Sequence, residues 1–201
     1  MTPFVVLEGV AAPLDRSKVD TDQILPARFL RRPRKQGYGQ FLFKDLADDP
    51  AFVLNQAPYR EAKILVADRA FGGGSSREQA PWALSDYGIR CVIAVDFGDI
   101  FYLNSLKSGV LPIALSHEVC TDLRQQLHQR PGATMKIDLP SQTVTAPDGS
   151  SHRFEIDAFR KKCLLEGLDD VGVTLQHEPA IAAFEQRYRQ RYDWLFDGNL
   201  Q

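Results

Sequence analysis

The segment KILVADRAFGGGSSREQAPWALSDYGIRCVIAVDFGDIFYLNSLKSGVLPIAL, residues 63–115, alternates short apolar runs with longer mixed segments. The apolar runs predict buried strands, at residues 63–67, 89–95 and 110–115. The segments between them predict helices, at residues 75–87 and 98–108. Gly88 and Gly109 follow these two segments, and glycine is a common helix stop. Strands that alternate with helices are typical of βαβ units, so this segment predicts a parallel sheet.

The flanking sequence adds further elements. Residues 4–10 predict another strand, and Ser116 suits the cap of a helix that ends near Arg130. Three more runs predict strands, two of which form a hairpin around the turn Pro147-Asp148-Gly149-Ser150, at residues 135–139, 143–146 and 152–156. Residues 178–194 predict a C-terminal helix with one apolar stripe, expected to be core: Ile181, Phe184, Tyr188 and Tyr192. Residues 15–39 predict a long polar loop.

Together these patterns predict an α/β fold in a single domain over residues 1–201. The sheet is expected to be mixed and largely parallel, with helices around it and a C-terminal hairpin plus helix. The 201 residues include 24 Lys and Arg and 26 Asp and Glu, and the net charge of -2 disfavours a nucleic-acid binder. The longest apolar runs are too short to span a bilayer, and the N-terminus has no signal-peptide pattern, so we expect a cytoplasmic protein.

Cysteine and histidine are scattered along the chain. Cys91, Cys120 and Cys163 form no CxxC pair, and the four histidines show no metal-ligand spacing. The sequence therefore predicts no metal site in this chain.

The segment from Phe71 to Glu78, FGGGSSRE, lies between a predicted strand and a predicted helix. Glycines allow the backbone to approach a ligand closely, and a helix start offers free N–H groups to an anion. Two hydroxyls and a guanidinium in the same turn add donors, and arginine suits a carboxylate. The segment matches neither the Walker phosphate loop nor GxGxxG. It predicts an anion-binding loop, although a plain turn in which serine caps the helix has the same composition.

Four ordered motifs carry a resemblance to a known family. AFGGGSSREQAPWAL at residues 70–84 resembles the signature of the small, swivelling domain of the aconitase superfamily. Further blocks agree in order: VDTDQILP at 19–26, DFGDIFYLN at 96–104 and GVLPI at 109–113. The closing stretch resembles bacterial 3-isopropylmalate dehydratase small subunits in particular, with IDAFRKKC at 156–163, GLD at 167–169 and GVTL at 172–175.

The resemblance implies that this chain is one subunit of a two-subunit enzyme. The family's hydro-lyases interconvert 2-isopropylmalate and 3-isopropylmalate by removing and re-adding water, in leucine biosynthesis. A [4Fe–4S] cluster is expected on a separate large subunit, where its iron acts on the departing hydroxyl. The small subunit is expected to close over it and contact the small diacid substrate, without a membrane or nucleic-acid partner.

The motif match also assigns roles. Ser75 would be the base, as an alkoxide stabilised by Arg77 and nearby N–H groups. Gly74, Ser76 and Arg77 would bind substrate carboxylate. Asp20, Thr21 and Asp22 would shape the active-site loop, where Asp-Thr-Asp more often bonds local N–H groups than it performs acid–base chemistry.

Arg31 is a further candidate for substrate binding. It follows Phe29 and Leu30, where homoaconitase-like relatives can carry a substrate-reading arginine. The alternative is a solvated loop charge or a contact with the large subunit.

Two residues depart from the family's usual FGCGSSREHA: Gly73 replaces the cysteine and Gln79 the histidine. These changes keep two other functions open. One is the small subunit of a paralogous hydro-lyase for another 2-substituted malate, of the homoaconitate or 2-methylmalate type. The other is a catalytically silent anion-binding protein of the same fold.

Overall fold

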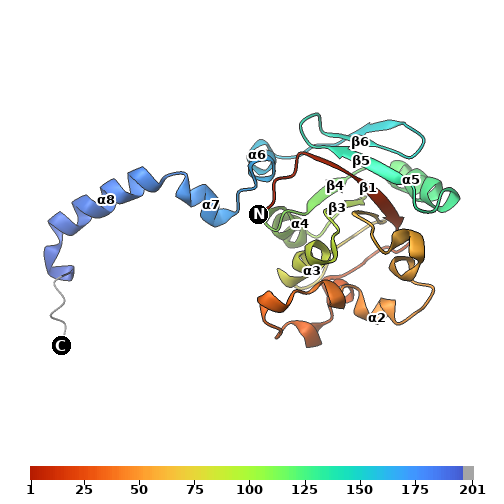
Figure 1. The fold of residues 1–201 in the computed structure, drawn as a ribbon, viewed down its shortest axis with the longest axis horizontal. Coiled ribbons are helices and arrows are strands. Elements are labelled where there is room, and N and C mark those ends of the chain that lie inside the picture. The colour runs from red at the N-terminus through yellow and green to blue at the C-terminus, as the bar shows by residue number, and fades with distance from the viewer. Residues whose placement is uncertain (197–201) are drawn as a thin grey trace. The chain divides into compact units, whose positions relative to one another are not determined.

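The computed structural model describes residues 1–196, and the chain divides into two compact units, residues 1–167 and 168–201. Each unit is described by itself. The first holds the whole sheet (Figure 1). The single domain over residues 1–201 stays a prediction.

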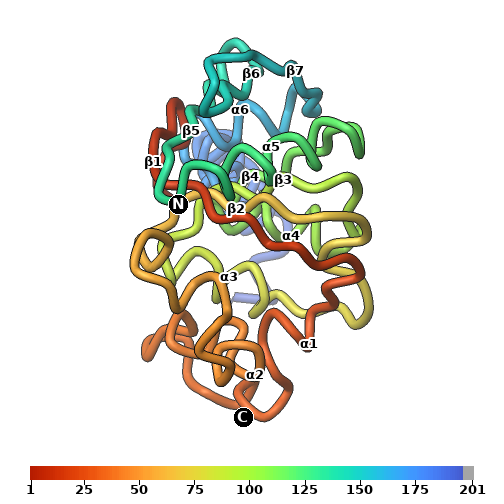
Figure 2. The backbone as a smooth tube through the Cα atoms, turned by 90° about the vertical axis from the view of Figure 1, so that its right-hand side faces the viewer, coloured from red at the N-terminus to blue at the C-terminus, as the bar shows by residue number. Residues whose placement is uncertain are grey.

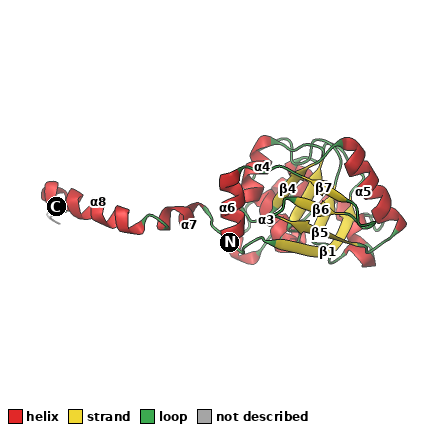
Figure 3. Ribbon diagram, turned by 90° about the horizontal axis from the view of Figure 1, so that it is seen from above, coloured by secondary structure: helices red, strands yellow, loops and turns green. Residues whose placement is uncertain are grey.

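The first unit is built on a seven-stranded sheet with the order β4-β3-β2-β1-β5-β6-β7. The strands, drawn in yellow in Figure 3, are β1 (Val6–Pro13), β2 (Ile64–Val66), β3 (Cys91–Ala94), β4 (Leu111–Ala114), β5 (Thr134–Asp138), β6 (Thr143–Thr145) and β7 (Ser151–Arg153). Strands β1 to β4 pair in parallel, whereas β5, β6 and β7 continue from β1 in antiparallel pairing. The prediction of an α/β fold with a mixed sheet is confirmed.

Helices cover both faces of the sheet because the central strands are apolar on both sides. In β2, Leu65 contributes to one buried cluster, while Ile64 and Val66 contribute to the other. This alternation follows from the two-residue period of a strand. The helices of this unit are α1 (Thr21–Ile24), α2 (Lys44–Ala47), α3 (Gln79–Tyr87), α4 (Asp99–Lys107), α5 (His117–Gln129) and α6 (Ala158–Glu166).

The largest helical differences from the sequence-based expectation are at α3 and α6. Helix α3 begins at Gln79 rather than at residue 75, so the preceding serines lie in a loop. Helix α6 was not predicted as a helix; its Asp157 cap accepts a hydrogen bond from the Arg160 N–H, and Gly167 ends it in the left-handed conformation. Helix α5 matches its prediction, with Ser116 as its cap.

The polar segment 15–39 is folded rather than irregular. It contains α1 and short 3-10 turns, and Figure 2 follows it in red and orange as it leaves β1. Tyr38 is buried, its hydroxyl donates to the carbonyl of Arg32 (2.6 Å) and its N–H donates to Asp86 (2.7 Å). Tertiary contacts therefore order a segment whose composition is that of a loop.

The second unit consists of α7 (Asp170–Leu175), α8 (Glu178–Arg191) and a 3-10 turn (Asp193–Leu195). No residue between 168 and 196 is buried. The aromatic stripe exists, because the rings of Phe184 and Tyr188 lie 5.6 Å apart and those of Tyr188 and Tyr192 lie 4.8 Å apart. The prediction that this stripe is core is wrong, since the unit has no layer to cover it. Among the described residues, no helix combines the length and apolar character needed to cross a membrane.

A buried arginine ties α5 to the ends of β1 and β2. Arg124 donates to the carbonyl of Ala67 (2.6 Å) and lies 3.1 Å from a carboxylate oxygen of Asp15 and 3.8 Å from one of Asp68. Its side chain is only 9% exposed. Asp68 lies two residues after the end of β2, so Arg124 holds the start of the connection from β2 to residues 71–78.

We expect Arg124→Ala to lower the free energy of unfolding by about 2 kcal/mol, because the Ala67 carbonyl loses a charged donor in a buried place. The control is Arg130→Ala, which removes an exposed arginine that donates to the carbonyl of Pro147. Urea titrations of both variants measure the difference. Equal losses would show that Arg124 has no special structural role.

Candidate active site

The glycine loop, defined here as residues 71–78, connects β2 to α3. The segment that follows β1 holds it on one side. The N–H of Gly72 donates to the carbonyl of Val19 (2.6 Å), and the N–H of Thr21 donates to the carbonyl of Gly73 (3.0 Å). The loop therefore starts as a short strand-like pairing with the segment around Thr21.

The segment that follows β3 holds the loop on the other side. The N–H of Phe71 donates to the carbonyl of Asp96 (3.1 Å), and the N–H of Gly98 donates to the carbonyl of Phe71 (2.9 Å). The carboxylate of Asp96 also accepts from the N–H of Ala70 (2.9 Å), which has a positive φ of 55°. Asp96 belongs to the motif at residues 96–104, and its motif alone predicted no role for its carboxylate.

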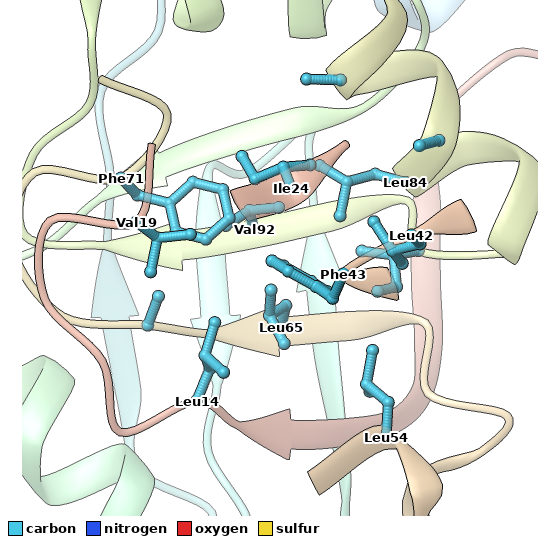
Figure 4. Packing of buried hydrophobic residues seen from close by; sticks show 14 of the residues in the cluster. Leu14, Val19, Ile24, Leu42, Phe43, Leu54, Leu65, Phe71, Leu84 and Val92 are labelled. Carbon is cyan, nitrogen blue, oxygen red and sulfur yellow. The ribbon is translucent and has the colours of Figure 1, made fainter. Parts of the chain in front are cut away.

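Close packing leaves no room for side chains at two glycines. A Cβ on Gly72, whose φ is +74°, would lie 2.2 Å from Cγ of Phe101. A Cβ on Gly98 would lie 2.5 Å from the carbonyl oxygen of Gly72. In Figure 4 the ring of Phe71 lies beside Val19, inside the buried cluster. The first half of the loop is thus part of the core.

The second half of the loop is open. Gly74, Ser75 and Ser76 are exposed. Among the described residues, no acceptor receives a hydrogen bond from the backbone N–H groups of residues 74–79 or from the hydroxyls of the two serines. Free N–H groups at the start of a helix favour an anion. The structure therefore places the predicted base, Ser75, among unused donors.

Arg77 points back toward the segment around Thr21. Its guanidinium forms an ion pair with Asp22 and donates to the carbonyl of Leu25 (3.4 Å). The side chain of Arg77 is 16% exposed, whereas that of Asp22 is 57% exposed. The hydrogen bond from Arg77 holds the pKa of the Asp22 carboxyl below its usual value; burial opposes this effect, and the N–H of Ala27 lowers the pKa further.

The first aspartate and the threonine of the motif serve the local fold. Asp20 caps α1 by accepting from the N–H of Gln23 (2.8 Å), as the loop-stabilising interpretation predicts. Because residues 21–24 form a helical turn, Asp20 and Asp22 are not presented along one extended strand. Thr21 is buried, and its hydroxyl donates to the carbonyl of Ser75 (2.8 Å). No sequence signal predicted this contact, which joins residues 54 positions apart.

Arg31 lies apart from these contacts. Three neighbouring arginines have partners: Arg28 pairs with Asp45, Arg34 pairs with Asp86, and Arg32 lies over the ring of Phe41. Arg31 is exposed and, among residues 1–196, has no hydrogen bond, ion pair or ring contact. The structure does not bring it into contact with the glycine loop.

The cysteines do not fit a metal cluster. Cys91, Cys120 and Cys163 are all buried. Burial raises the pKa of the Cys91 thiol and raises that of Cys120 to about 11, so thiolates are disfavoured at both. Within the described part of the chain, no three residues among His, Cys, Asp and Glu gather as metal ligands. The residues that the structure describes therefore do not fit an iron–sulfur cluster.

Two adjacent glycines give a stability test of the loop. Gly73 has a φ outside the left-handed region, and the nearest atom to a Cβ there is 4.0 Å away. We expect Gly73→Ala to raise the free energy of unfolding by about 0.5 kcal/mol. We expect Gly72→Ala to lower it by about 2 kcal/mol, since it must displace Phe101. Equal shifts in a denaturant titration would contradict the described loop.

Comparison with known proteins places the chain in a family. The family described as Aconitase C-terminal domain matches residues 1–118, and one described as LeuD_N matches residues 121–158. A third, described as the C-terminal domain of the 3-isopropylmalate dehydratase small subunit, matches residues 170–198.

Similar proteins of full length agree. The 3-isopropylmalate dehydratase small subunit of Xanthobacter autotrophicus is 51% identical over 97% of this chain and 100% of its own length. That of Brevibacillus brevis is 51% identical over 93% and 100%. A crystal structure of 3-isopropylmalate dehydratase from Methanocaldococcus jannaschii, 27% identical, aligns with a TM-score of 0.68 over 90% of this chain and 99% of its own. The chain therefore belongs to the 3-isopropylmalate dehydratase small subunits of the aconitase superfamily.

Proposed function

We propose that this chain is the small subunit of a hydro-lyase that interconverts 2-isopropylmalate and 3-isopropylmalate. The observation that carries the proposal is the open half of the glycine loop. It presents the Ser75 hydroxyl, unused N–H groups and Arg77 together at one turn. The names of the relatives reported above support 2-isopropylmalate as the substrate. The geometry of the loop supports proton removal and carboxylate binding.

The first step of the proposed reaction is proton removal by Ser75. As an alkoxide it takes the proton from the carbon next to a carboxylate, and the electron pair of that C–H bond forms the double bond as hydroxide leaves the adjacent carbon. Water then adds with the opposite orientation: Ser75 gives its proton to the carbon that lost the hydroxide, and hydroxide joins the carbon that lost the proton. Serine is too weak an acid to ionise unaided, so nearby N–H donors and Arg77 must stabilise the alkoxide.

Substrate carboxylate is bound by the same turn. Arg77 has a planar set of donors that suits a carboxylate. In the structure, Asp22 forms an ion pair with part of the Arg77 guanidinium and holds it in place. Gly74 lets the backbone approach the carboxylate closely, and Ser76 adds a hydroxyl. A diacid is therefore bound by a preformed set of donors rather than by a flexible charge.

The proposed enzyme is active only with a large subunit. This chain supplies a base and carboxylate donors, and its buried cysteines are unsuited to a cluster. We propose that the [4Fe–4S] cluster, the Lewis acid for the departing hydroxyl, belongs to the large subunit. We further propose that the assembled enzyme works in the cytoplasm, in leucine biosynthesis.

Arg31 supports a second candidate function. Its exposed guanidinium has no partner in the described chain and can bind a third carboxylate of the substrate, as a homoaconitate-type substrate would require. A 2-methylmalate-type substrate would leave it unused. Relatives with 51% sequence identity carry the name 3-isopropylmalate dehydratase small subunit. Neither this alternative nor a silent anion-binding protein is therefore favoured.

The catalytic assignment is tested with Ser75→Ala in the complex with a cluster-loaded large subunit. We expect kcat to fall about 10³-fold, because the base is removed while the carboxylate donors remain. The control is Ser150→Ala, which removes an exposed turn hydroxyl and should leave kcat unchanged. Full activity of Ser75→Ala would exclude Ser75 as the base.

The substrate assignment is tested with Arg31→Val. For 2-isopropylmalate we expect kcat/KM to stay within about threefold, because an isopropyl group gives a guanidinium nothing to bind. A fall of about tenfold or more, confined to homoaconitate, would instead favour the second candidate. Arg28→Val serves as the matched control, since Arg28 is paired with Asp45. Steady-state kinetics with both substrates distinguish the outcomes.

A further inference from the structure

We propose that Thr21 is a positioning residue, which fixes the two peptide groups whose N–H bonds stabilise the Ser75 alkoxide. The inference rests on the proposed function and deepens it, because it assigns the electrostatic support of the base to a residue that contacts Ser75 only through its backbone carbonyl.

Thr21 holds the glycine loop at two carbonyls. Its N–H donates to the carbonyl of Gly73 (3.0 Å), and its hydroxyl donates to the carbonyl of Ser75 (2.8 Å). The residue between them, Gly74, has a φ of +85°. The two bonds therefore fix the peptide that joins Gly73 to Gly74 and the peptide that joins Ser75 to Ser76, one before and one after the left-handed turn at Gly74.

The orientation of two N–H groups follows from these bonds. In a trans peptide the C=O and the following N–H point in opposite directions, and the described chain has no cis peptide. With the carbonyls of Gly73 and Ser75 turned toward Thr21, the N–H groups of Gly74 and Ser76 point away from it. Neither has an acceptor within residues 1–196. They are thus two preoriented donors next to the Ser75 side chain.

Thr21 can act in this way because it is itself fixed. It is 2% exposed, and its carbonyl accepts from the N–H of Leu25 (3.0 Å). The preceding Asp20 caps the same helical turn in a reciprocal arrangement with Gln23. A buried hydroxyl must keep its hydrogen bond, so its bond to the Ser75 carbonyl is a stable feature rather than one that water replaces.

Thr21→Val tests the inference in the complex with a cluster-loaded large subunit. Valine keeps the shape and the backbone N–H but removes the hydroxyl. We expect kcat for 2-isopropylmalate to fall about 30-fold, less than the loss of a donor that contacts the reacting group itself, with KM changed less than about threefold. The rise of kcat with pH should also move to higher pH, because a less stabilised alkoxide forms less readily. Thr21→Ser should restore most of kcat.

The matched control is Thr143→Val. Thr143 lies on β6, outside the site, and its hydroxyl bonds to that of Ser141 (2.8 Å). We expect unchanged kcat and an unchanged pH profile. Thermal unfolding of each variant separates a loss of fold from a loss of catalysis. If Thr21→Val does not fold, Thr21→Cys takes its place, and its weak thiol donor should give a kcat below that of Thr21→Ser.

The outcomes separate this inference from the proposed function. An active wild-type complex together with a Thr21→Val variant of unchanged kcat and pH profile would overturn the role of Thr21 alone. A Thr21→Val variant that loses stability but retains kcat would likewise reduce Thr21 to a structural residue, and so would a Thr21→Cys variant equal to Thr21→Ser. A wild-type complex without turnover of 2-isopropylmalate would overturn the proposed function, and with it the inference.

Discussion

The hydrogen bonds on either side of the glycine loop are the constraint on which the site depends. The segment around Val19 and Thr21 holds one side, and Asp96 and Gly98 hold the other. These bonds use carbonyls of the loop and the N–H groups of its first residues, whereas the N–H groups of residues 74–79 have no acceptor within residues 1–196. The anchoring of the first half of the loop in the core thus leaves a turn whose free donors suit an anion.

This arrangement fits our proposal that the site is one half of a catalytic centre shared by two chains. It supplies donors for a carboxylate and, by our proposal, a base, and these are groups that a rigid loop can preorganise. Within residues 1–196 no group of possible metal ligands gathers, and the three cysteines are packed in the core as small apolar side chains. A reaction that needs both a base and a Lewis acid is then divided between two chains, as the small-subunit relatives suggest.

The alternation of apolar runs predicted β2, β3 and β4 to within two residues at each end, because buried parallel strands are apolar throughout. The start of α3 could not be predicted in the same way. Serine is a residue type that commonly caps a helix, which favoured a helix start at Ser75. In the structure the Ser75 carbonyl instead accepts a hydrogen bond from Thr21, which lies 54 positions away in the sequence. Both residues lie in motifs shared with the family, but the hydrogen bond between them follows only from the structure. The pairing of Asp22 with Arg77 was missed for the same reason.

The most direct measurement is the rate of 2-isopropylmalate dehydration after this chain is mixed, without oxygen, with a cluster-loaded 3-isopropylmalate dehydratase large subunit. Each chain alone is the control. Turnover by the mixture only is the predicted result, because neither chain alone holds both the base and the Lewis acid. A stable complex of the two chains that leaves 2-isopropylmalate unchanged would contradict the proposed function of the glycine loop.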